Sequence, residues 1–257
     1  MSTIHSVTNP TVKHLVRMRS NRARRRAGEV LTDDDVTTAA AIAAGLKPIA
    51  FYVLENHRVA MALPIEPTPV SPAVMRKIAY GQNASTLIGR FTFGEAQQML
   101  DALPPLRRVM VLDRMEKPGN VGAVFRSVDG AGFDAVLLCD GGDPSHPNAV
   151  RNSRGASITI PSRETSHDDA IEFLRRRGFT IYAARVRNSD VTQSRRYDQV
   201  DYGPPVAIVI GNEADGLGDR FTGPGIVDVH IPMAGRVDSL NAAVTAAVLA
   251  FRAAATR

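Results

Sequence analysis

The feature that most restricts the fold is a regular alternation of short apolar runs and helical patterns between residues 107 and 254. Runs of three to five apolar residues between polar, glycine-containing segments are typical of strands buried on both faces of a sheet. Strands that alternate with helices predict an α/β fold with a mostly parallel sheet. The expected strands cover residues 109–112, 135–139, 158–160, 180–184, 206–210 and 227–231.

Four helices are expected in the same region of the chain. They cover residues 121–131, 148–154, 168–177 and 239–254. The last helix carries small apolar residues on nearly all sides, which predicts burial rather than an amphipathic surface position. Ser239, a short polar residue at its start, could cap the free backbone N–H groups there.

The first hundred residues show a looser alternation, which predicts a smaller α/β domain. Apolar residues at helical spacing within 12–16 are followed by a basic run that ends at Arg26. The further expected elements are helices at 36–44 and 74–79, a strand at 49–54 and a weak helix at 95–103. The predicted organisation is a first domain at 1–95, a linker at 96–106 and a second domain at 107–257.

The positive charge of the chain is confined to its first part. Residues 1–100 carry 12 basic and 7 acidic residues, whereas residues 101–257 carry 19 of each. Of the 31 basic residues, 27 are arginines, whose planar guanidinium suits phosphate groups and stacks on bases. Such a basic segment indicates nucleic acid as a partner. A compositional bias toward arginine, a solvated helix face or an organellar transit peptide would give a similar pattern.

Several other protein classes are disfavoured by the composition. A chain of 257 residues can bury a sizeable core without a disulfide or a metal. The single cysteine, Cys139, excludes a disulfide framework, and its place at the end of an apolar run predicts a buried thiol. The six histidines lack metal-ligand spacing, so no metal site is expected. No bilayer-spanning stretch or signal-peptide core is present, so we expect a soluble intracellular protein that does not bind membranes.

Three unusual loops follow apolar runs, at the ends of strands where parallel sheets bind their ligands. The first is Lys-Pro-Gly-Asn-Val-Gly at 117–122, followed by Arg126. The second is Gly-Asn-Glu-Ala-Asp-Gly-Leu at 211–217. The third is Ile-Pro-Met-Ala-Gly at 231–235, which leads into Ser-Leu-Asn at 239–241. Each loop alone could be only a tight turn, and neither a P-loop nor a G-x-G-x-x-G fingerprint is present.

Taken together and in this order, the three loops resemble the SpoU/TrmH family of RNA ribose 2′-O-methyltransferases, which belongs to the SPOUT class. The resemblance covers residues 107–254 closely and extends more loosely to 5–13, which is similar to the opening of two-domain members. It implies an S-adenosylmethionine (SAM) site in a C-terminal trefoil knot, preceded by an L30e-like RNA-binding domain. Residues 31–35 depart from the family, whose members often have a Glu-Gly pair there.

The resemblance also implies which residues form the site. Those that match catalytic positions are Arg126, Asn120, Glu213, Ser239 and Asn241. Those that match SAM-binding positions are Gly211, Asn212, Leu217, Ile231, Met233 and Leu240. Because an arginine side chain is always protonated, we expect Arg126 to grip the ribose and a neighbouring phosphate, with Asn120 beside it. Glu213 would orient Arg126 or the hydroxyl, and Ser239 and Asn241 would tie the SAM loop; a catalytic role of Asn241 stays open.

RNA is the implied partner, together with a second copy of the chain. The residues expected to contact RNA are Lys13, Arg17, Arg24, Arg25, Arg26, Arg151 and Arg154. For the last two, a solvated surface role is equally compatible with the sequence. Because the family dimerises through its C-terminal helix, we expect a homodimer. The two-domain layout favours ribosomal RNA of the 23S type in the cytoplasm, with transfer RNA as the alternative substrate and antibiotic resistance as an open role.

Two functions of other classes stay open. One is a non-catalytic RNA-binding or ribosome-assembly factor that retains the knot fold. The joint presence of the five residues at catalytic positions argues against it, because a binding protein does not need them. The other is a small-molecule enzyme, which would not show the salt-sensitive RNA affinity that phosphate contacts produce.

Overall fold

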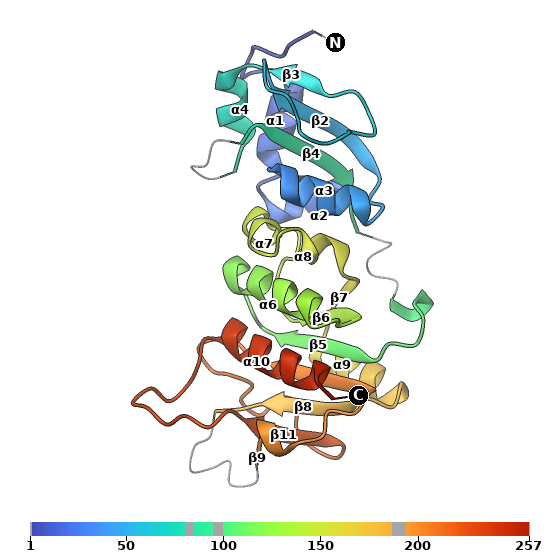
Figure 1. Cartoon of the computed structure of the whole chain (residues 1–257), viewed down its shortest axis with the longest axis vertical. Helices are drawn as coiled ribbons and strands as arrows, with labels where there is room; N and C mark the ends of the chain where they lie inside the picture. Colours follow the sequence, from blue (N-terminus) through green and yellow to red (C-terminus); the bar gives the residue numbers. More distant parts are fainter. Residues whose placement is uncertain (1, 81–84, 95–99, 187–193, 257) are drawn as a thin grey trace. The chain divides into compact units, whose positions relative to one another are not determined.

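The computed structural model of the chain divides into two compact units. The first unit comprises Met1–Ala96 and Asp143–Thr159, and the second comprises Gln97–Gly142 and Ile160–Arg257. The structure describes residues 2–80, 85–94, 100–186 and 194–256. Each unit contains one sheet with helices packed against it (Figure 1), which confirms the predicted α/β class.

The first unit is built on a small mixed sheet with the strand order β1-β4-β2-β3. Strand β4 is antiparallel to both of its neighbours, whereas β2 and β3 are parallel. Its elements are α1 (Pro10–Arg17), α2 (Asn21–Ala27), β1 (Glu29–Thr32), α3 (Asp35–Ala43), β2 (Pro48–Leu54), β3 (Thr68–Val70), α4 (Pro72–Ile78), β4 (Leu87–Thr92), α7 (Pro147–Asn152) and α8 (Ala156–Thr159).

Helix caps and two apolar layers explain these elements. The side chains of Asn9, Asp34 and Ser71 accept backbone N–H groups at the starts of α1, α3 and α4. Side chains of α1 and α4 form one apolar cluster with Tyr52 and Ile88 of the sheet, while a second cluster joins other sheet residues to α3, α7 and α8. The sheet is therefore covered on both faces.

The segment Asp143–Thr159 belongs to the first unit, although the predicted domains 1–95 and 107–257 are continuous stretches of chain. Buried Arg24 explains part of this, because its guanidinium pairs with Asp143 and donates to Ser145 Oγ at 3.0 Å. Arg151 pairs with Asp33 in the same way. The sequence did not predict this grouping.

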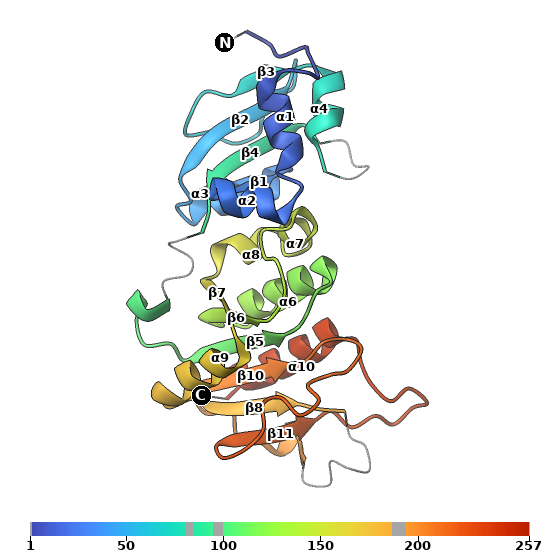
Figure 2. The ribbon, with the colours of Figure 1, turned by 180° about the vertical axis from the view of Figure 1, so that it is seen from behind.

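The second unit contains a seven-stranded sheet with the order β7-β6-β5-β10-β8-β11-β9, in which every pair of neighbours is parallel. Helices α6 and α10 pack side by side on one face, and α9 covers the other face (Figures 1 and 2). Its elements are η1 (Leu100–Ala102), β5 (Arg108–Asp113), α6 (Pro118–Gly130), β6 (Ala135–Cys139), β7 (Ser162–Thr165), α9 (His167–Arg176), β8 (Thr180–Ala184), β9 (Arg195–Arg196), η2 (Tyr197–Gln199), β10 (Val206–Ile210), β11 (Ile226–His230) and α10 (Ala242–Ala254).

The position of β10 matters for the site. This strand comes late in the chain but lies in the middle of the sheet, between β5 and β8. The order of the strands therefore reverses beside β10. Parallel sheets bind their ligands at the carboxyl ends of the strands next to such a reversal. The trefoil knot and the likeness of the first unit to L30e stay predictions.

Most of the predicted elements are confirmed, to within three residues at each end. The strand expected at 158–160 is wrong, because Ala156–Thr159 is helical and the strand follows at Ser162–Thr165. A three-residue apolar run does not distinguish a strand from a buried helical turn, and Ile158 is buried in the second apolar cluster of the first unit. Of the helix expected at 95–103, residues 95–99 lie outside the described residues.

The final helix begins later than predicted. It starts at Ala242, and the side chain of Asn241 caps it by accepting the N–H of Ala243 at 2.8 Å and that of Val244 at 3.4 Å. The capping role considered for Ser239 is therefore wrong.

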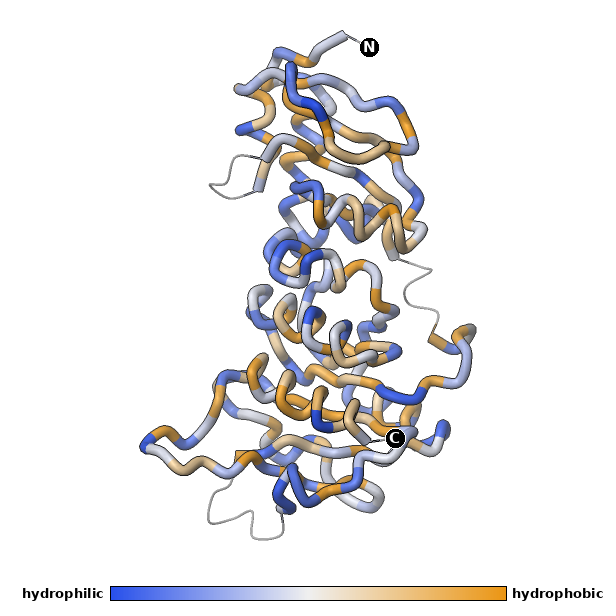
Figure 3. The backbone as a smooth tube through the Cα atoms, in the orientation of Figure 1, coloured by the Kyte–Doolittle hydropathy of each residue, from blue (hydrophilic) through white to orange (hydrophobic). Residues whose placement is uncertain are grey.

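Apolar residues predominate in α10, along which the tube in Figure 3 is mostly orange. The five residues of β10 are all buried, as expected for a central strand with helices on both faces. Among the described residues, no helix combines the length and the apolar character that crossing a membrane requires.

Candidate functional site

A cavity of the second unit lies where β8, β10 and β11 end. Its volume is about 660 Å³, which is within the range of small-molecule sites. All six residues predicted to bind the cofactor line it: Gly211, Asn212, Leu217, Ile231, Met233 and Leu240. These residues come from the connections after β10 and β11, which the strand order brings to one edge of the sheet.

Gly211 lets the loop after β10 fold tightly back on itself. A Cβ atom at this position would lie 2.2 Å from the carbonyl carbon of Gly216 and 2.6 Å from the N atom of Leu217. The Oδ1 atom of Asn212 accepts the N–H groups of Ala214 and Asp215, at 3.1 and 2.7 Å, and so fixes the turn. One wall of the cavity is therefore a tight loop in which the backbone of Gly211 packs against that of Gly216 and Leu217.

Three of the residues predicted to be catalytic meet beside this cavity. Asn120, at the start of α6, donates its Nδ2 hydrogen to Glu213 Oε1. Asn241 Nδ2 lies 3.4 Å from Asn120 Oδ1, so that a weak hydrogen bond joins them. Glu213 and Asn241 themselves line the cavity. Asn120 thus binds the carboxylate of Glu213 directly and is itself bound by Asn241, so that three separate segments of the chain meet in one row of hydrogen bonds.

The other two predicted catalytic residues are placed differently. Ser239 lines the cavity but is exposed, and its hydroxyl donates to Asp238 Oδ1 at 3.2 Å. Arg126 lies on α6, is exposed and does not line the cavity. Within the described part of the chain it forms no hydrogen bond or ion pair. Its guanidinium is therefore available to a group that comes from outside the unit.

The seven residues predicted to contact RNA all belong to the first unit. Lys13, Arg17, Arg25, Arg26 and Arg154 are exposed. Arg24 is only 1% exposed, and in addition to its contacts with Asp143 and Ser145 it donates to the carbonyl groups of Met18 and Arg19. Arg151 is half-buried and donates to Tyr80 O at 2.8 Å as well as pairing with Asp33. The expectation that Arg24 contacts RNA is therefore corrected, because its buried guanidinium is used inside the unit, whereas an RNA contact of Arg151 stays a prediction.

Cavity-lining residues that the sequence reasoning missed include Lys117 and Arg185. Arg185 directly follows the apolar strand β8, so the rule that ligands bind at the carboxyl ends of parallel strands points to it as well. The thiol of Cys139 is buried as predicted. Burial, aided by the nearby charges of Asp113 and Asp140, raises its pKa to about 12, which keeps the thiol protonated at neutral pH.

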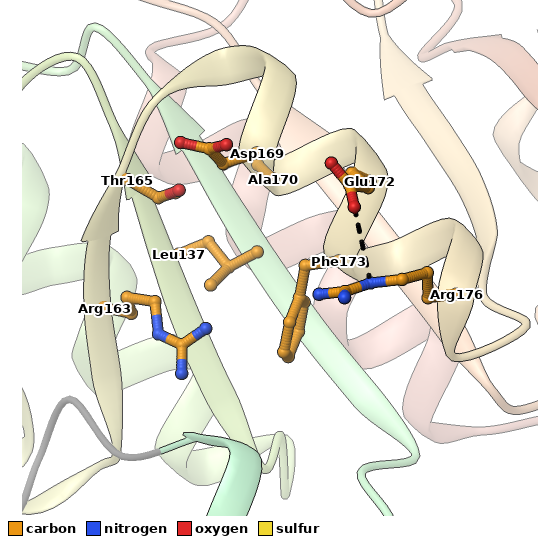
Figure 4. Close-up of a pocket in the computed structure, with 8 residues that line it drawn as sticks. All are labelled: Leu137, Arg163, Thr165, Asp169, Ala170, Glu172, Phe173 and Arg176. Carbon is orange, nitrogen blue, oxygen red and sulfur yellow. Dashed lines mark ion pairs between the residues drawn. The ribbon is translucent and has the colours of Figure 1, made fainter.

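A second, smaller cavity of about 190 Å³ lies between α9 and the edge of the sheet (Figure 4). Arg163 stacks over the ring of Phe173, and Glu172 pairs with Arg176 at 3.8 Å. None of the predicted site residues lines it. Arg163 also pairs with Asp101, and Asp169 accepts the hydroxyl of Ser166, so each charged group of the lining already has a partner and we assign no site there.

The residues around the larger cavity fit a SAM molecule. A nucleoside can be held by backbone N–H and C=O groups together with an apolar wall, and the loop at 211–217 offers backbone groups at its tight turn. Ile231, Met233 and Leu240 contribute apolar surface to the same cavity. No group of three or more His, Cys, Asp or Glu side chains among the described residues is arranged to hold a metal ion.

Comparison with known proteins identifies the family. The model of the SpoU rRNA Methylase family matches residues 107–251. A 23S rRNA (guanosine(2553)-2′-O)-methyltransferase, RlmP, from Bacillus subtilis is 28% identical over 152 residues, which are 59% of this chain and 59% of that protein. The chain thus matches less than two thirds of the length of this relative.

Two crystal structures match along almost the whole chain. An RNA 2′-O ribose methyltransferase is 30% identical with a TM-score of 0.83, and the match covers 98% of both chains. An rRNA methyltransferase from Sinorhizobium meliloti with bound AdoMet, another name for SAM, is 25% identical with a TM-score of 0.82. The match covers 98% of this chain and 97% of that one. The chain belongs to the SpoU rRNA methylase family, whose members are SAM-dependent RNA 2′-O-methyltransferases.

Proposed function

We propose that the protein transfers a methyl group from SAM to a ribose 2′-hydroxyl of a structured RNA. The observation that carries this proposal is the cavity of about 660 Å³ with Glu213 fixed beside it by Asn120, because it combines a nucleoside-sized site with an oriented polar group. SAM supplies an electrophilic methyl group that its positive charge already activates. The protein therefore mainly has to align the acceptor hydroxyl and exclude other orientations.

Each of the site residues has a distinct task in this proposal. The loop at 211–217 and the apolar side chains Ile231, Met233 and Leu240 hold the cofactor. Asn120, itself bound by Asn241, holds the carboxylate of Glu213, which accepts a hydrogen bond from the ribose. Arg126 binds the ribose and the adjacent phosphate from the exposed face of α6. A guanidinium suits this task because its planar set of donors matches phosphate oxygens.

The proposed substrate is ribosomal RNA of the 23S type. The named activity of the Bacillus subtilis relative supports this, as does the nearly full-length likeness to an rRNA methyltransferase from Sinorhizobium meliloti. The first unit would recognise the RNA through phosphate contacts and shape, since the deep major groove of an RNA helix is not readable by side chains. We expect the protein to act on this RNA in the cytoplasm.

Calorimetric titration with SAM, alone and with RNA present, tests the proposal. Binding in either condition is expected, because the cavity is formed by the chain itself. Failure to bind in both conditions would favour a non-catalytic RNA-binding factor. SAM binding without any RNA affinity would favour an enzyme that acts on a small molecule.

RNA affinity is expected to fall steeply with salt and to depend on the exposed arginines of α2. Each phosphate contact that is removed should lower the slope of log K against log salt concentration by about 0.7–0.9. The double variant Arg22→Ala/Arg26→Ala should therefore lose between one and two units of slope in filter-binding titrations. The matched control is Arg175→Ala/Arg176→Ala, which removes the same charge from α9 and should leave the slope unchanged. An equal loss of slope in the two double variants would contradict the assignment.

Asn241 is expected to have two separable roles. Asn241→Ala removes the cap of α10 and should lower the free energy of unfolding by about 1 kcal/mol. Asn241→Asp keeps the capping oxygen but loses the amide that faces Asn120, so stability should be retained while methyl transfer falls about tenfold. Urea unfolding and a methyl-transfer assay on both variants check this. If Asn241→Asp keeps full activity, the contact between Asn241 and Asn120 does not contribute to methyl transfer, and Asn241 only caps α10.

We also propose that the protein is a homodimer that uses α10. Val244 and Phe251 of this helix are 48% and 55% exposed in the single chain, and large apolar side chains in such positions favour burial against a partner. Phe251→Asp should therefore shift the sedimentation coefficient from dimer to monomer. Val36→Asp, which places the same charge at an exposed residue of the first unit, should not. A monomeric wild-type protein would contradict the proposal.

A further inference from the structure

Arg185 binds the backbone of residues 218–221, which directly follow the loop at 211–217. Arg185 follows β8, and its side chain is only 9% exposed. Its Nη1 donates to Gly218 O at 2.7 Å, and its Nη2 donates to the carbonyl oxygens of Arg220 and Phe221, both at 2.9 Å. Three carbonyl groups within four residues are thus bound by a single guanidinium.

The orientation of this guanidinium is fixed by a carboxylate on the neighbouring strand. Arg185 Nε donates to Asp228 Oδ1 of β11 at 2.6 Å. A short bond between charged groups of this kind is stronger than a neutral hydrogen bond. Lysine cannot replace the arrangement, because one ammonium group lacks the planar spread of donors that reaches four acceptors.

The bound carbonyl groups adjoin the part of the loop that would contact the cofactor. Leu217 and Gly218 line the cavity. Phe221, at the other end of the bound stretch, has a φ of +52°, a left-handed conformation that costs free energy for a bulky residue. The contact with Arg185 therefore fixes a strained segment whose first residues form the cavity wall.

The loop is also held from β5, the strand that flanks β10 on the side opposite to β8. Arg220 donates to Asp113, which is fully buried at the end of β5, with 3.0 Å between Arg220 Nε and Asp113 Oδ1. Arg114 Nη2 donates to Gly216 O at 3.2 Å. The loop is therefore tied to β5 as well as to β8, and Arg185 makes more hydrogen bonds to its backbone than any other described side chain.

We propose that Arg185 is a positioning residue for SAM: it orders the loop around Leu217 and Gly218 before the cofactor arrives. A loop that is already ordered loses less conformational freedom on binding, which raises affinity. Arg185 itself lines the cavity, but its guanidinium donates to the loop and to Asp228, so its effect acts through the loop. This inference rests on the proposed function and extends it to a residue outside the three loops that define the family resemblance.

The test is the replacement Arg185→Lys in the full-length protein. The dissociation constant of SAM should rise about tenfold in calorimetry, as expected for the loss of one or two hydrogen bonds. The KM for SAM should rise in parallel, while kcat at saturating SAM should stay within about twofold. Hydrogen–deuterium exchange at 211–221 should become faster in the protein without SAM, a readout that does not depend on activity.

Arg175→Lys is the matched control. Arg175 is exposed and donates to Pro224 O at 2.9 Å, farther along the same connection between β10 and β11. The same substitution there should change neither the SAM affinity nor the exchange at 211–221. A tenfold loss of affinity in both variants would overturn the specific role of Arg185.

Asp228→Asn provides a second variant that retains Arg185 and its carbonyl contacts. It should weaken SAM binding by about threefold, since it removes only the charge that orients the guanidinium. If Arg185→Lys does not fold, this variant decides the question. Unchanged SAM affinity and exchange in the folded variants would overturn the inference while leaving the proposed function intact. A wild-type protein that does not bind SAM would overturn the proposed function itself.

Discussion

Gly211→Ala is expected to raise the dissociation constant of SAM by at least about 100-fold, which corresponds to about 2.7 kcal/mol. The reason is steric, because the new Cβ would lie 2.2 Å from the carbonyl carbon of Gly216. The clashing atoms belong to the backbone and cannot move aside as a flexible side chain would. The loop would have to open, and the cavity wall that it forms would be lost. Calorimetry on the cofactor-free protein measures the effect.

Gly235→Ala serves as the control for this substitution. No atom lies within 4 Å of the position of its Cβ, so the added methyl group has space. This variant should bind SAM like the wild-type protein. If Gly211→Ala also binds SAM within threefold of the wild-type affinity, the loop at 211–217 is not the wall of the SAM site.

Arg126→Ala is expected to lower the rate of methyl transfer by about 10²–10³-fold, in the range found when one stabilising hydrogen-bond donor is removed from an active site. The affinity for SAM should change by less than about twofold, because Arg126 does not line the cavity. The loss should therefore appear in kcat and in the KM for RNA. Single-turnover transfer of a labelled methyl group measures it.

Arg176→Ala removes an equivalent charge from α9, on the opposite face of the second sheet. Arg176 is 68% exposed and pairs with Glu172 of its own helix. This control should keep full activity and full SAM affinity. Full activity of Arg126→Ala would show that the arginine of α6 does not act on the substrate, and loss of SAM binding in that variant would place it at the cofactor instead.

The periodic pattern of the second half of the sequence was sufficient to predict the parallel sheet. Strand β10, for example, is short and wholly apolar and lies between Pro205 and Gly211, so its limits follow from the sequence alone. The rule that ligands bind where such strands end then identified the loops at 211–217 and 231–235. Local patterns succeeded here because each strand and its following loop are consecutive in the chain.

The failures have a common physical cause, which is that contacts between distant residues decided the outcome. Arg24 lies in a run of arginines that the sequence cannot distinguish, yet it is buried because Asp143, more than a hundred positions away, pairs with it. Ile158 is apolar but helical, because it packs against residues of the first unit. Arg185 was overlooked because three of its four partners are backbone carbonyl groups, which carry no sequence information.

The most direct test of the account is to incubate the wild-type protein with methyl-labelled SAM and unmodified RNA and to identify the labelled nucleosides after digestion. The RNA should include transcripts of 23S ribosomal RNA and, separately, of transfer RNA. We predict label in a single 2′-O-methylnucleoside of the ribosomal transcript. Label in transfer RNA alone would correct the substrate and leave the chemistry intact. Label on a base, or no label in a protein that binds both SAM and RNA, would contradict the proposed ribose methylation.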